Sequence, residues 1–374
     1  MNTRDPFPAH IRREDDRETR QTVSEHNRQT GQYAGRALLP CELVKTAYLA
    51  GLLHDMGKYT AQYQKYIEDA VSGENPAARG SVNHSFAAVR YLLEHYHGRG
   101  SPCGPLTAEL LADAAGAHHG LFDCVDAEHR SGFQHRLEKE GICYEEAVQN
   151  FLQYCAGTEE LDALFAEAEG EIEQAYRKLI PLLRQDETAS EEARFYLGML
   201  ARLLLSAVIE GDRRDTAEFE QGAPFPESRS PEELRALWET LSARVDGKLN
   251  RLPHETEVEK ARREISDRCR AFAEKPGGIY RLNVPTGAGK TLSSLRYALA
   301  HAARYGKSRI LFISPLLSIL DQNAKVIRQY IGDDSLILEH HSNVVQEETP
   351  DTQAAREELD RREFLTETWD SPLI

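Results

Sequence analysis

A chain of 374 residues is long enough for two domains, and a hydrophobic content of 40% is sufficient for ordinary buried cores. The net charge of −16 excludes a protein that coats nucleic acid by bulk electrostatics, although a local basic groove or bound metal ions could still supply positive charge. The six cysteines form no C-x-x-C pair, which favours a reducing cytoplasm, and no apolar run resembles a signal peptide or a membrane span.

The first half of the chain has a helical pattern. The first twenty residues are mostly charged and predict a solvated arm or an entry strand, and no convincing strand alternation follows up to about residue 215. Helices are expected at 22–37, 42–56, 59–71, 84–97, 107–117, 143–155, 158–184 and 189–211. Residues 1–225 are therefore interpreted as one all-α domain.

The second half changes character after a linker. Residues 226–275 are expected to hold this linker and two charged helices, which either bridge the domains or begin the second one. Residues 276–374 indicate a parallel α/β unit. Its expected strands are 279–284, 309–314 and a short one near 335–338, and its expected helices are 290–304, 316–330 and a polar helix at 352–366.

The stretch from Gly51 to Lys58 is the most informative part of the first domain. An apolar helix is expected to run into His54 and Asp55 and to stop at Gly57. An adjacent histidine and aspartate at the end of a buried helix are costly unless something pairs with them. That partner is either a divalent metal ion or a neighbouring carboxylate, and this stretch alone leaves both open.

Similar side chains recur at or near the ends of other predicted helices. The full set is His26, His54, Asp55, His84, His118, His119 and Asp212. Any one of these histidines alone is more readily an ordinary polar residue, but the order H…HD…H…HH…D is specific. Histidine and aspartate suit Mn, Fe, Co, Ni or Zn, and two ions bridged by one carboxylate would form a clamp for hydrolysis of phosphate esters. The remaining histidines, His10 among them, are given no role.

This order resembles the HD phosphohydrolase superfamily. The elements His54-Asp55-x-Gly57-Lys58, Asn83-His84-Ser85 and His118-His119-Gly120, with Ser206 and Asp212-Arg213 near the end, resemble the HD nuclease domain of the CRISPR-associated nuclease–helicase of type I systems.

The resemblance implies a role for each of these residues. One divalent transition-metal ion (Mn, Fe, Co or Ni) would be held by His26, His54, Asp55 and Asp212. A second would be held by Asp55, His84, His118 and His119. Asp55 would be shared by both ions, Lys58 would lie beside the scissile phosphate as a catalytic residue, and Ser206 would support the ligands from behind. From the residues alone, Lys58 could also be a helix-end lysine and Ser206 a hydroxyl bonded to its own helix.

A glycine-rich turn follows the expected strand 279–284 and opens the helix 290–304. Its candidate ATP-binding residues are Thr286, Gly287, Ala288, Gly289, Lys290 and Thr291. Such a loop presents backbone N–H groups to phosphates, while Lys290 would contact the β- and γ-phosphates and Thr291 would ligate Mg²⁺. Val284 replaces the first glycine of the usual pattern, which fits the shorter loop of superfamily 2 helicases. Ser314 and Pro315 resemble the motif of those helicases that touches the DNA backbone, or else form a helix-capping turn.

Together the resemblances imply an all-α HD-type domain followed by an incomplete α/β RecA-like helicase lobe. The implied activity is a metal-dependent single-stranded DNA nuclease joined to an ATP-dependent helicase or translocase, which degrades invader DNA. The lobe is expected to be truncated before the Walker B motif, so this chain alone is expected to lack ATPase and helicase activity. The implied partners are single-stranded DNA, the guide-RNA surveillance complex Cascade, which recruits the enzyme, and an anti-CRISPR inhibitor protein. The alternatives are an HD-family nucleotide phosphohydrolase and an inactive scaffold that recruits a partner.

Overall fold

The computed structural model describes residues 5–14, 17–72, 82–98, 101–121, 131–138, 143–225, 228–340, 369 and 371–374. The chain divides into two compact units, Met1–Phe225 and Pro226–Ile374. The helix expected at 352–366 lies outside the described residues. None of the helices within those ranges combines the length and the apolar character that crossing a bilayer requires.

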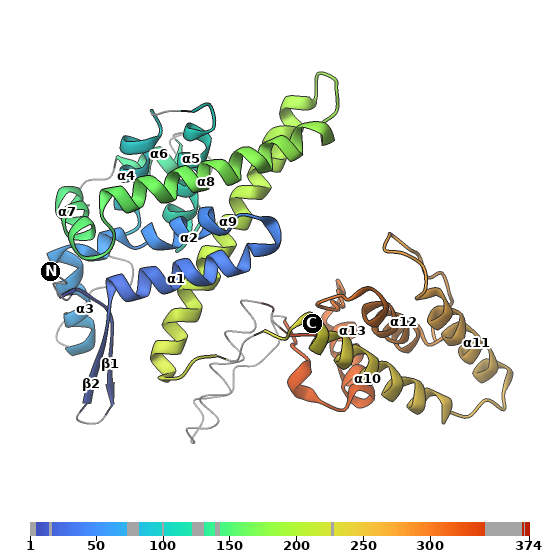
Figure 1. The fold of residues 1–374 in the computed structure, drawn as a ribbon. Helices are drawn as coiled ribbons and strands as arrows, with labels where there is room; N and C mark the ends of the chain where they lie inside the picture. The colour runs from blue at the N-terminus through green and yellow to red at the C-terminus, as the bar shows by residue number, and fades with distance from the viewer. Residues whose placement is uncertain are drawn as a thin grey trace. The chain divides into compact units, whose positions relative to one another are not determined.

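The first unit begins with a hairpin and continues as a helical bundle (Figure 1). Strand β1 (Pro8–Glu14) pairs antiparallel with β2 (Arg17–Thr22), so the expected arm is a two-stranded ribbon. The helices are α1 (Val23–Ala37), α2 (Val44–Leu53), α3 (Ala61–Ser72), α4 (Phe86–Tyr96), α5 (Gly104–Ala117), α6 (Gly132–Leu137), α7 (Tyr144–Tyr154), α8 (Thr158–Leu179) and α9 (Ala189–Gln221). Short 3₁₀ turns lie at Leu39–Cys41, Met56–Tyr59 and Ile180–Leu182.

Local sequence signals start and stop these helices. Thr22 and Glu25 form a reciprocal capping box at the start of α1, which satisfies backbone N–H groups that have no partner inside the helix. Helix α9 is capped after Gln221 by Gly222, whose φ of 71° is a left-handed conformation that glycine adopts without strain. The apolar faces of the helices then form one continuous core, with Leu52, Leu111 and Phe151 fully buried.

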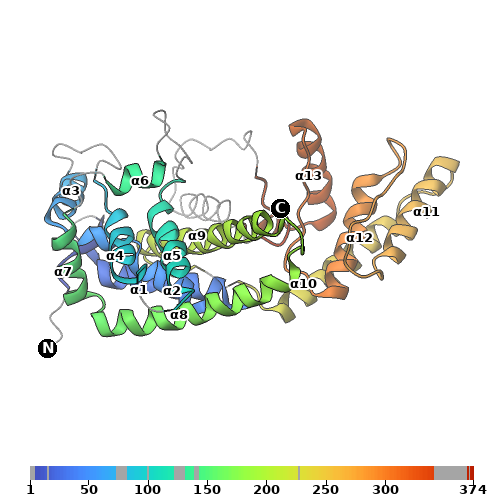
Figure 2. The ribbon, with the colours of Figure 1, turned by 90° about the horizontal axis from the view of Figure 1, so that it is seen from above.

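Glycines let helices α1, α2 and α9 approach closely, and Figure 2 shows α1, α2 and α5 grouped near α9. A Cβ atom on Gly51 of α2 would lie 2.8 Å from the Cα of Gly31 on α1. A Cβ on Gly211 of α9 would lie 2.6 Å from the Thr30 carbonyl oxygen on the same helix α1. Because real Cβ atoms do not come this close to backbone, the three helices can cross here only through glycine.

Gly51→Ala is expected to destabilise the first unit by roughly 1–3 kcal/mol, because the new methyl group overlaps backbone that cannot move independently. This corresponds to a melting temperature lowered on the order of 5 °C in a calorimetric or dye-based melt. Gly170→Ala on α8 is the matched control: nothing lies within 4 Å of its added Cβ, so alanine should leave stability unchanged or raise it. Equal melting temperatures for the wild type and Gly51→Ala would contradict the close crossing.

Three predicted helix ends in this unit are wrong, one of them the end expected at 184, since α8 ends at Leu179. Helix α2 ends at Leu53, and Gly57 lies in the 3₁₀ turn Met56–Tyr59. The Gly57 N–H donates to the His84 carbonyl oxygen at 3.0 Å, and a side chain on Gly57 would overlap the His84 backbone. Glycine is therefore needed here for a close approach, not for helix termination. Helix α9 continues past residue 211 to Gln221.

The second unit packs its helices against three short segments joined by isolated parallel bridges, and the strand expected at 309–314 is reduced to one such bridge at Ile310. Its helices are α10 (Pro231–Asn250), α11 (Glu257–Phe272), α12 (Lys290–Tyr305) and α13 (Leu317–Ile331). Trp238 of α10 and Leu299 of α12 are fully buried in its core. Residues 372–374 lie between 310–312 and 336–338, with the Ile310 N–H donating to the Pro372 carbonyl oxygen at 2.9 Å and parallel bridges from Leu373 to Ile310 and Ile337.

The strand expected at 279–284 does not form. Ile279 and Leu282 are exposed, and these residues have no ladder hydrogen bond to any part of the chain that the structure describes. An apolar segment becomes a strand only where a neighbour pairs with it, so composition alone was an insufficient guide. The short strand near 335–338 is a 3₁₀ turn at Asp334–Leu336 followed by a single bridge at Ile337.

Candidate functional site

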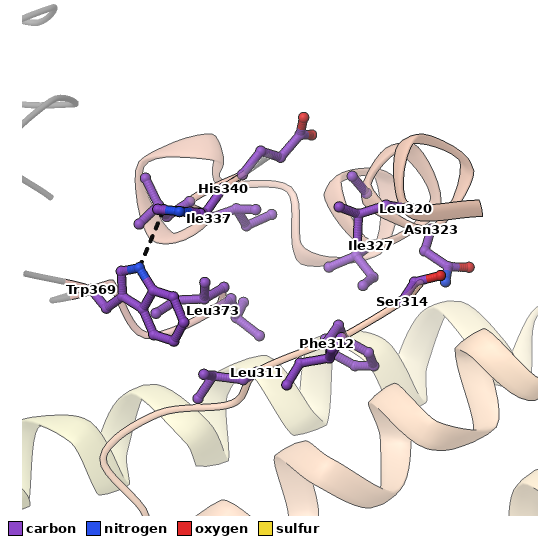
Figure 3. A pocket seen from close by; sticks show the side chains of 15 residues that line it. Leu311, Phe312, Ser314, Leu320, Asn323, Ile327, Ile337, His340, Trp369 and Leu373 are labelled. Atoms are coloured by element: carbon purple, nitrogen blue, oxygen red, sulfur yellow. Dashed lines mark hydrogen bonds between the residues drawn. The ribbon is translucent and has the colours of Figure 1, made fainter. Parts of the chain in front are cut away.

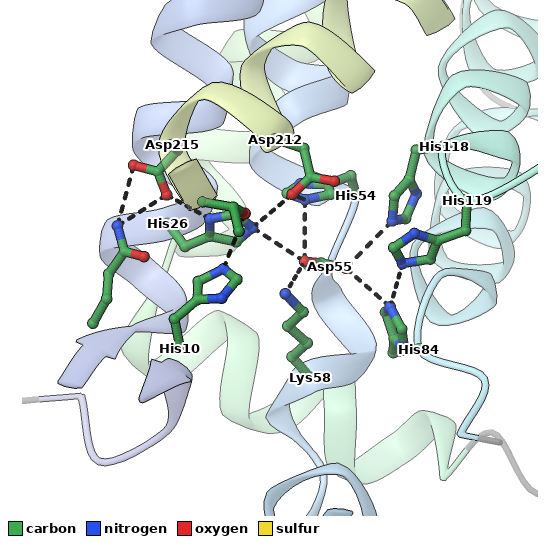
Figure 4. A network of polar contacts seen from close by, with 12 residues as sticks. His10, His26, His54, Asp55, Lys58, His84, His118, His119, Asp212 and Asp215 are labelled. Atoms are coloured by element: carbon green, nitrogen blue, oxygen red, sulfur yellow. Dashed lines mark hydrogen bonds and ion pairs between the residues drawn. The ribbon is translucent and has the colours of Figure 1, made fainter. Parts of the chain in front are cut away.

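The seven predicted ligands gather in one buried cluster of the first unit (Figure 4). His26 comes from the first turns of α1, and His54 and Asp55 directly follow α2. The other members are His84 before α4, His118 and His119 after α5, and Asp212 on α9. Since α9 continues beyond Asp212, this residue reaches the cluster from the middle of a helix and not from its end.

Asp55 belongs to both of the groups that could hold a metal ion. One group is His26, His54, Asp55 and Asp212, and the other is Asp55, His84, His118 and His119, with the donor atoms of each within 4.8 Å of one another. The Oδ2 atom of Asp55 lies 3.3 Å from His26 Nε2 and 3.1 Å from His54 Nε2. The Oδ1 atom lies 3.5 Å from Nε2 of both His84 and His118. One oxygen therefore faces each group, as in a bridging carboxylate.

The histidine rings are held so that Nε2 points inward. The Nδ1 atom of His54 lies 2.7 Å from the Gly51 carbonyl oxygen, and Nδ1 of His118 lies 2.7 Å from the Ala115 carbonyl oxygen. The Nδ1 atom of His84 lies 3.0 Å from the Val82 carbonyl oxygen. Because a carbonyl oxygen can only accept, Nδ1 carries the proton in each ring. The Nε2 lone pairs of His54 and His118 remain for a metal ion, while Nε2 of His84 lies 2.6 Å from Nε2 of His119.

The buried polar atoms of the cluster fit a divalent cation. Nε2 of His26, His54 and His118 and both carboxylate oxygens of Asp55 are buried and make no hydrogen bond to any described residue. They approach one another at ion-pair distances but without hydrogen-bonding geometry. Leaving such atoms unsatisfied is costly, and imidazole with carboxylate is a donor set suited to divalent transition metals.

The two groups differ in their electrostatics. Burial, the strongest influence, opposes a proton on His26, but Asp212, Asp215 and Asp55 outweigh it and raise the pKa of His26 to about 10. In the other group, burial lowers the pKa of His84 to about 3 and that of His119 to about 4. The first group thus draws positive charge strongly, while His84 and His119 of the second group stay neutral.

Lys58 lies inside the cluster and Ser206 does not. Lys58 is buried in the turn after Asp55, with its Nζ 2.6 Å from Asp55 Oδ2. Burial opposes its charge, but Asp55 holds the pKa of Lys58 above its ordinary value, so the ammonium persists. Ser206 is exposed on α9, and six residues place it about 120° around the helix from Asp212. The structure therefore does not bring Ser206 to the ligands.

Three residues without a predicted role surround His26. Asp215, buried on α9, places its Oδ2 2.6 Å from His26 Nδ1. Gln21 of β2 donates to both carboxylate oxygens of Asp215, at 3.1 and 2.9 Å. His10 of β1 packs edge-on against His26, with ring centroids 4.7 Å apart, and burial lowers the pKa of His10. The spacing Asp212-x-x-Asp215, which puts both carboxylates on one helix face, was the available signal for Asp215.

The glycine-rich turn of the second unit opens a helix as expected, although the strand expected before it does not form. Gly287 and Gly289 both have φ of 81°, and Lys290 and Thr291 open helix α12. Two contacts support the loop from other helices: Arg262 Nε of α11 donates to the Gly287 carbonyl oxygen at 2.8 Å, and the Thr291 hydroxyl donates to Asn323 Oδ1 of α13 at 2.8 Å. The backbone can therefore curl around an anion at the start of a helix.

Ser314 lines a cavity of about 280 Å³ in the same unit (Figure 3). The lining is mostly apolar and includes Leu311, Leu320 and Trp369, with Asn323 as a further polar residue. The Leu316 N–H lies 3.4 Å from Ser314 Oγ, a long capping contact, and Pro315 is exposed. Ser314 is thus placed near Asn323, the residue that holds Thr291 of the phosphate loop.

Comparison with known protein families gives two matches. Residues 16–206 match the family described as Cas3, HD domain, and residues 255–365 match the one described as type III restriction enzyme, res subunit. No curated protein matches the chain. The first match covers more than half of the chain and includes every cluster residue except Asp212, which the structure adds. The chain therefore belongs to the Cas3 HD-domain family, as a Cas3-like nuclease–helicase in which a helicase-like region follows the helical HD nuclease domain.

Proposed function

We propose that the HD unit hydrolyses the phosphodiester backbone of single-stranded DNA at a centre that holds two divalent transition-metal ions (Mn, Fe, Co or Ni). The observation that carries this proposal is the shared Asp55, one of whose oxygens faces each four-residue group. Two ions bound there would activate a water molecule and stabilise the attacking and leaving oxygens of the phosphate.

The protein residues have distinct parts in this proposal. His26, His54 and Asp212 would hold one ion, His84, His118 and His119 would hold the other, and Asp55 would contribute to both. Lys58, a buried ammonium 2.6 Å from Asp55, offsets the negative charge that develops on the phosphate. Nδ1–H groups held by carbonyl oxygens keep the rings from turning, so the donor atoms are already in place before an ion arrives.

The second unit is proposed to bind ATP with Mg²⁺ as the ATPase lobe of a helicase, while this chain by itself is expected to show neither ATPase nor helicase activity. The candidate nucleotide-binding residues are Thr286, Gly287, Ala288, Gly289, Lys290 and Thr291, and Ser314 and Pro315 are the candidate DNA contacts. The match to the restriction-enzyme res subunit and the two positive-φ glycines support this role. In the full helicase, ATP-driven movement would feed a single strand to the nuclease.

The proposed biological setting is type I CRISPR defence against invader DNA. The supporting observation is membership of the Cas3 HD-domain family. In this setting the guide-RNA surveillance complex Cascade would recruit the chain to DNA that the complex has opened, and an anti-CRISPR protein would be an inhibitor. The net charge of −16 supports a DNA path confined to a narrow local channel, since the molecule as a whole repels a polyanion.

The test is a parallel hydrolysis assay on the full chain. Single-stranded DNA, double-stranded DNA and deoxynucleoside triphosphates are each incubated with Mn²⁺, Co²⁺, Ni²⁺ or Mg²⁺. We expect cleavage of the single strand with the transition metals, loss of cleavage with a chelator, and recovery when metal is returned. Hydrolysis of free nucleotides without DNA cleavage would instead identify a nucleotide phosphohydrolase. Failure to bind metal or hydrolyse anything would favour a scaffold.

A further inference from the structure

A buried carboxylate, that of Asp215, contacts His26 on the side that faces away from the metal-binding cluster. Asp215 is 4% exposed, and its Oδ2 lies 2.6 Å from His26 Nδ1. It stands one helical turn after Asp212 on α9, so one helix supplies a carboxylate to each side of the same imidazole (Figure 4). The carboxylate of Asp215 accepts two contacts from the Gln21 amide, which fixes its orientation.

This support distinguishes His26 from His54, His84 and His118. Nδ1 of His54, His84 and His118 faces a neutral backbone carbonyl oxygen, at 2.7, 3.0 and 2.7 Å. Nδ1 of His26 faces a charged acceptor at 2.6 Å instead. A carboxylate behind an imidazole makes the opposite nitrogen a stronger donor to a metal ion, and hydrogen bonds to charged groups are stronger than neutral ones.

The two groups also differ in their number of carboxylates, and this difference favours stronger cation binding in the group of His26. The group of His26 contains Asp55 and Asp212, with Asp215 directly behind it. The group of His84 contains only the shared Asp55, and His119 is the most exposed of its four residues. A cation therefore meets more negative charge, less screened by water, in the first group.

The hairpin β1–β2 is part of this arrangement. Its strand β2 supplies Gln21, which holds Asp215, and its strand β1 supplies His10, which packs on the His26 ring. Arg12 of β1 also donates to the Phe219 carbonyl oxygen at 2.7 Å, which ties the hairpin to the end of α9. The hairpin and α9, which flank His26 on this side, are thereby tied to each other.

We propose that Asp215, held by Gln21 of the hairpin, is a positioning residue that makes the His26–His54–Asp55–Asp212 group the tighter of the two metal sites, so that this site fills first. The inference rests on the proposed two-metal function and adds an order of loading to it. Asp215 acts only through His26 and contacts neither ion.

The experiment is a calorimetric titration of the metal-stripped full chain with Mn²⁺. The wild type should show a tight step and a weaker step. Asp215→Asn should weaken the tight step roughly 10- to 100-fold and leave the weaker one within about twofold. Gln21→Ala should weaken the same step by a smaller factor, and it carries the test if Asp215→Asn does not fold. His84→Ala should remove the weaker step and keep the tight one.

The control is Asp162→Asn. Asp162 accepts a hydrogen bond from the Tyr96 hydroxyl at 2.9 Å and lies outside the cluster, so this variant should bind metal like the wild type. If Asp215→Asn leaves the tight step unchanged or weakens both steps equally, the inference is overturned while the two-metal centre stands. A wild type that binds no Mn²⁺ would overturn both.

Discussion

Asp55→Asn is expected to release both metal ions at once and to lower single-strand cleavage by at least about 10³-fold. The reason is geometric, because Asp55 Oδ2 faces His26 and His54 while Oδ1 faces His84 and His118. An amide keeps the shape of the side chain but removes the negative charge that both groups share. Metal content by elemental analysis, measured beside cleavage, should fall from two ions per chain to none.

Variants that alter a single metal-binding group are the comparison for Asp55→Asn. His84→Ala removes a donor from one group, and Asp212→Asn removes a carboxylate from the other. Each is expected to retain one ion per chain, because the remaining group is complete. If Asp55→Asn also retained one ion, Asp55 would serve a single site and would not be a bridge.

The Asp55→Asn experiment needs a control for folding, because Asp55 also pairs with a buried lysine. Lys58 Nζ lies 2.6 Å from Asp55 Oδ2, and breaking a buried ion pair costs roughly 3–5 kcal/mol. The double variant Asp55→Asn with Lys58→Met removes the unpaired charge and should recover the melting temperature of the metal-free wild type. It should still bind no metal, which separates loss of the site from loss of the fold.

The candidate metal ligands could be predicted from the sequence because most of them occur in short, recognisable motifs. Adjacent pairs such as His54-Asp55 and His118-His119 stand next to apolar helical stretches, and the structure gathers them in one cluster. The C-terminal end of α9 could not be predicted in this way. Asp212 breaks an apolar run, but the residues after it continue the helix, and Arg214 and Glu218 pair at 3.0 Å along it.

The environment of His26 was missed for a different reason. The hairpin turns polar side chains, His10 and Gln21, toward Asp215 and His26. Strands are recognised in sequence by alternating apolar residues, and a strand whose inward positions are polar lacks that signal. The failed strand at 279–284 is the converse case, because its apolar residues satisfy the pattern but no described neighbour pairs with them.

Lys290→Ala is expected to weaken ATP binding roughly 10- to 100-fold, the equivalent of a hydrogen bond to a charged group. Lys290 is exposed at the first position of α12, directly after Gly289, so its ammonium can reach an anion bound in the loop. Equilibrium binding of a fluorescent ATP analogue to the full chain measures this loss. Lys325→Ala, which removes an exposed lysine of α13 outside the loop, is the matched control and should bind as the wild type does.

Asn323 allows the contribution of Mg²⁺ to be separated from that of Lys290. The Thr291 hydroxyl donates its proton to Asn323 Oδ1 at 2.8 Å, which leaves the oxygen lone pairs of Thr291 available to a cation. Asn323→Ala should therefore weaken binding in the presence of Mg²⁺ and change it little with a chelator, whereas Lys290→Ala should weaken both. Equal losses for Asn323→Ala with and without Mg²⁺ would show that Asn323 supports the loop as a whole and does not orient the Thr291 hydroxyl.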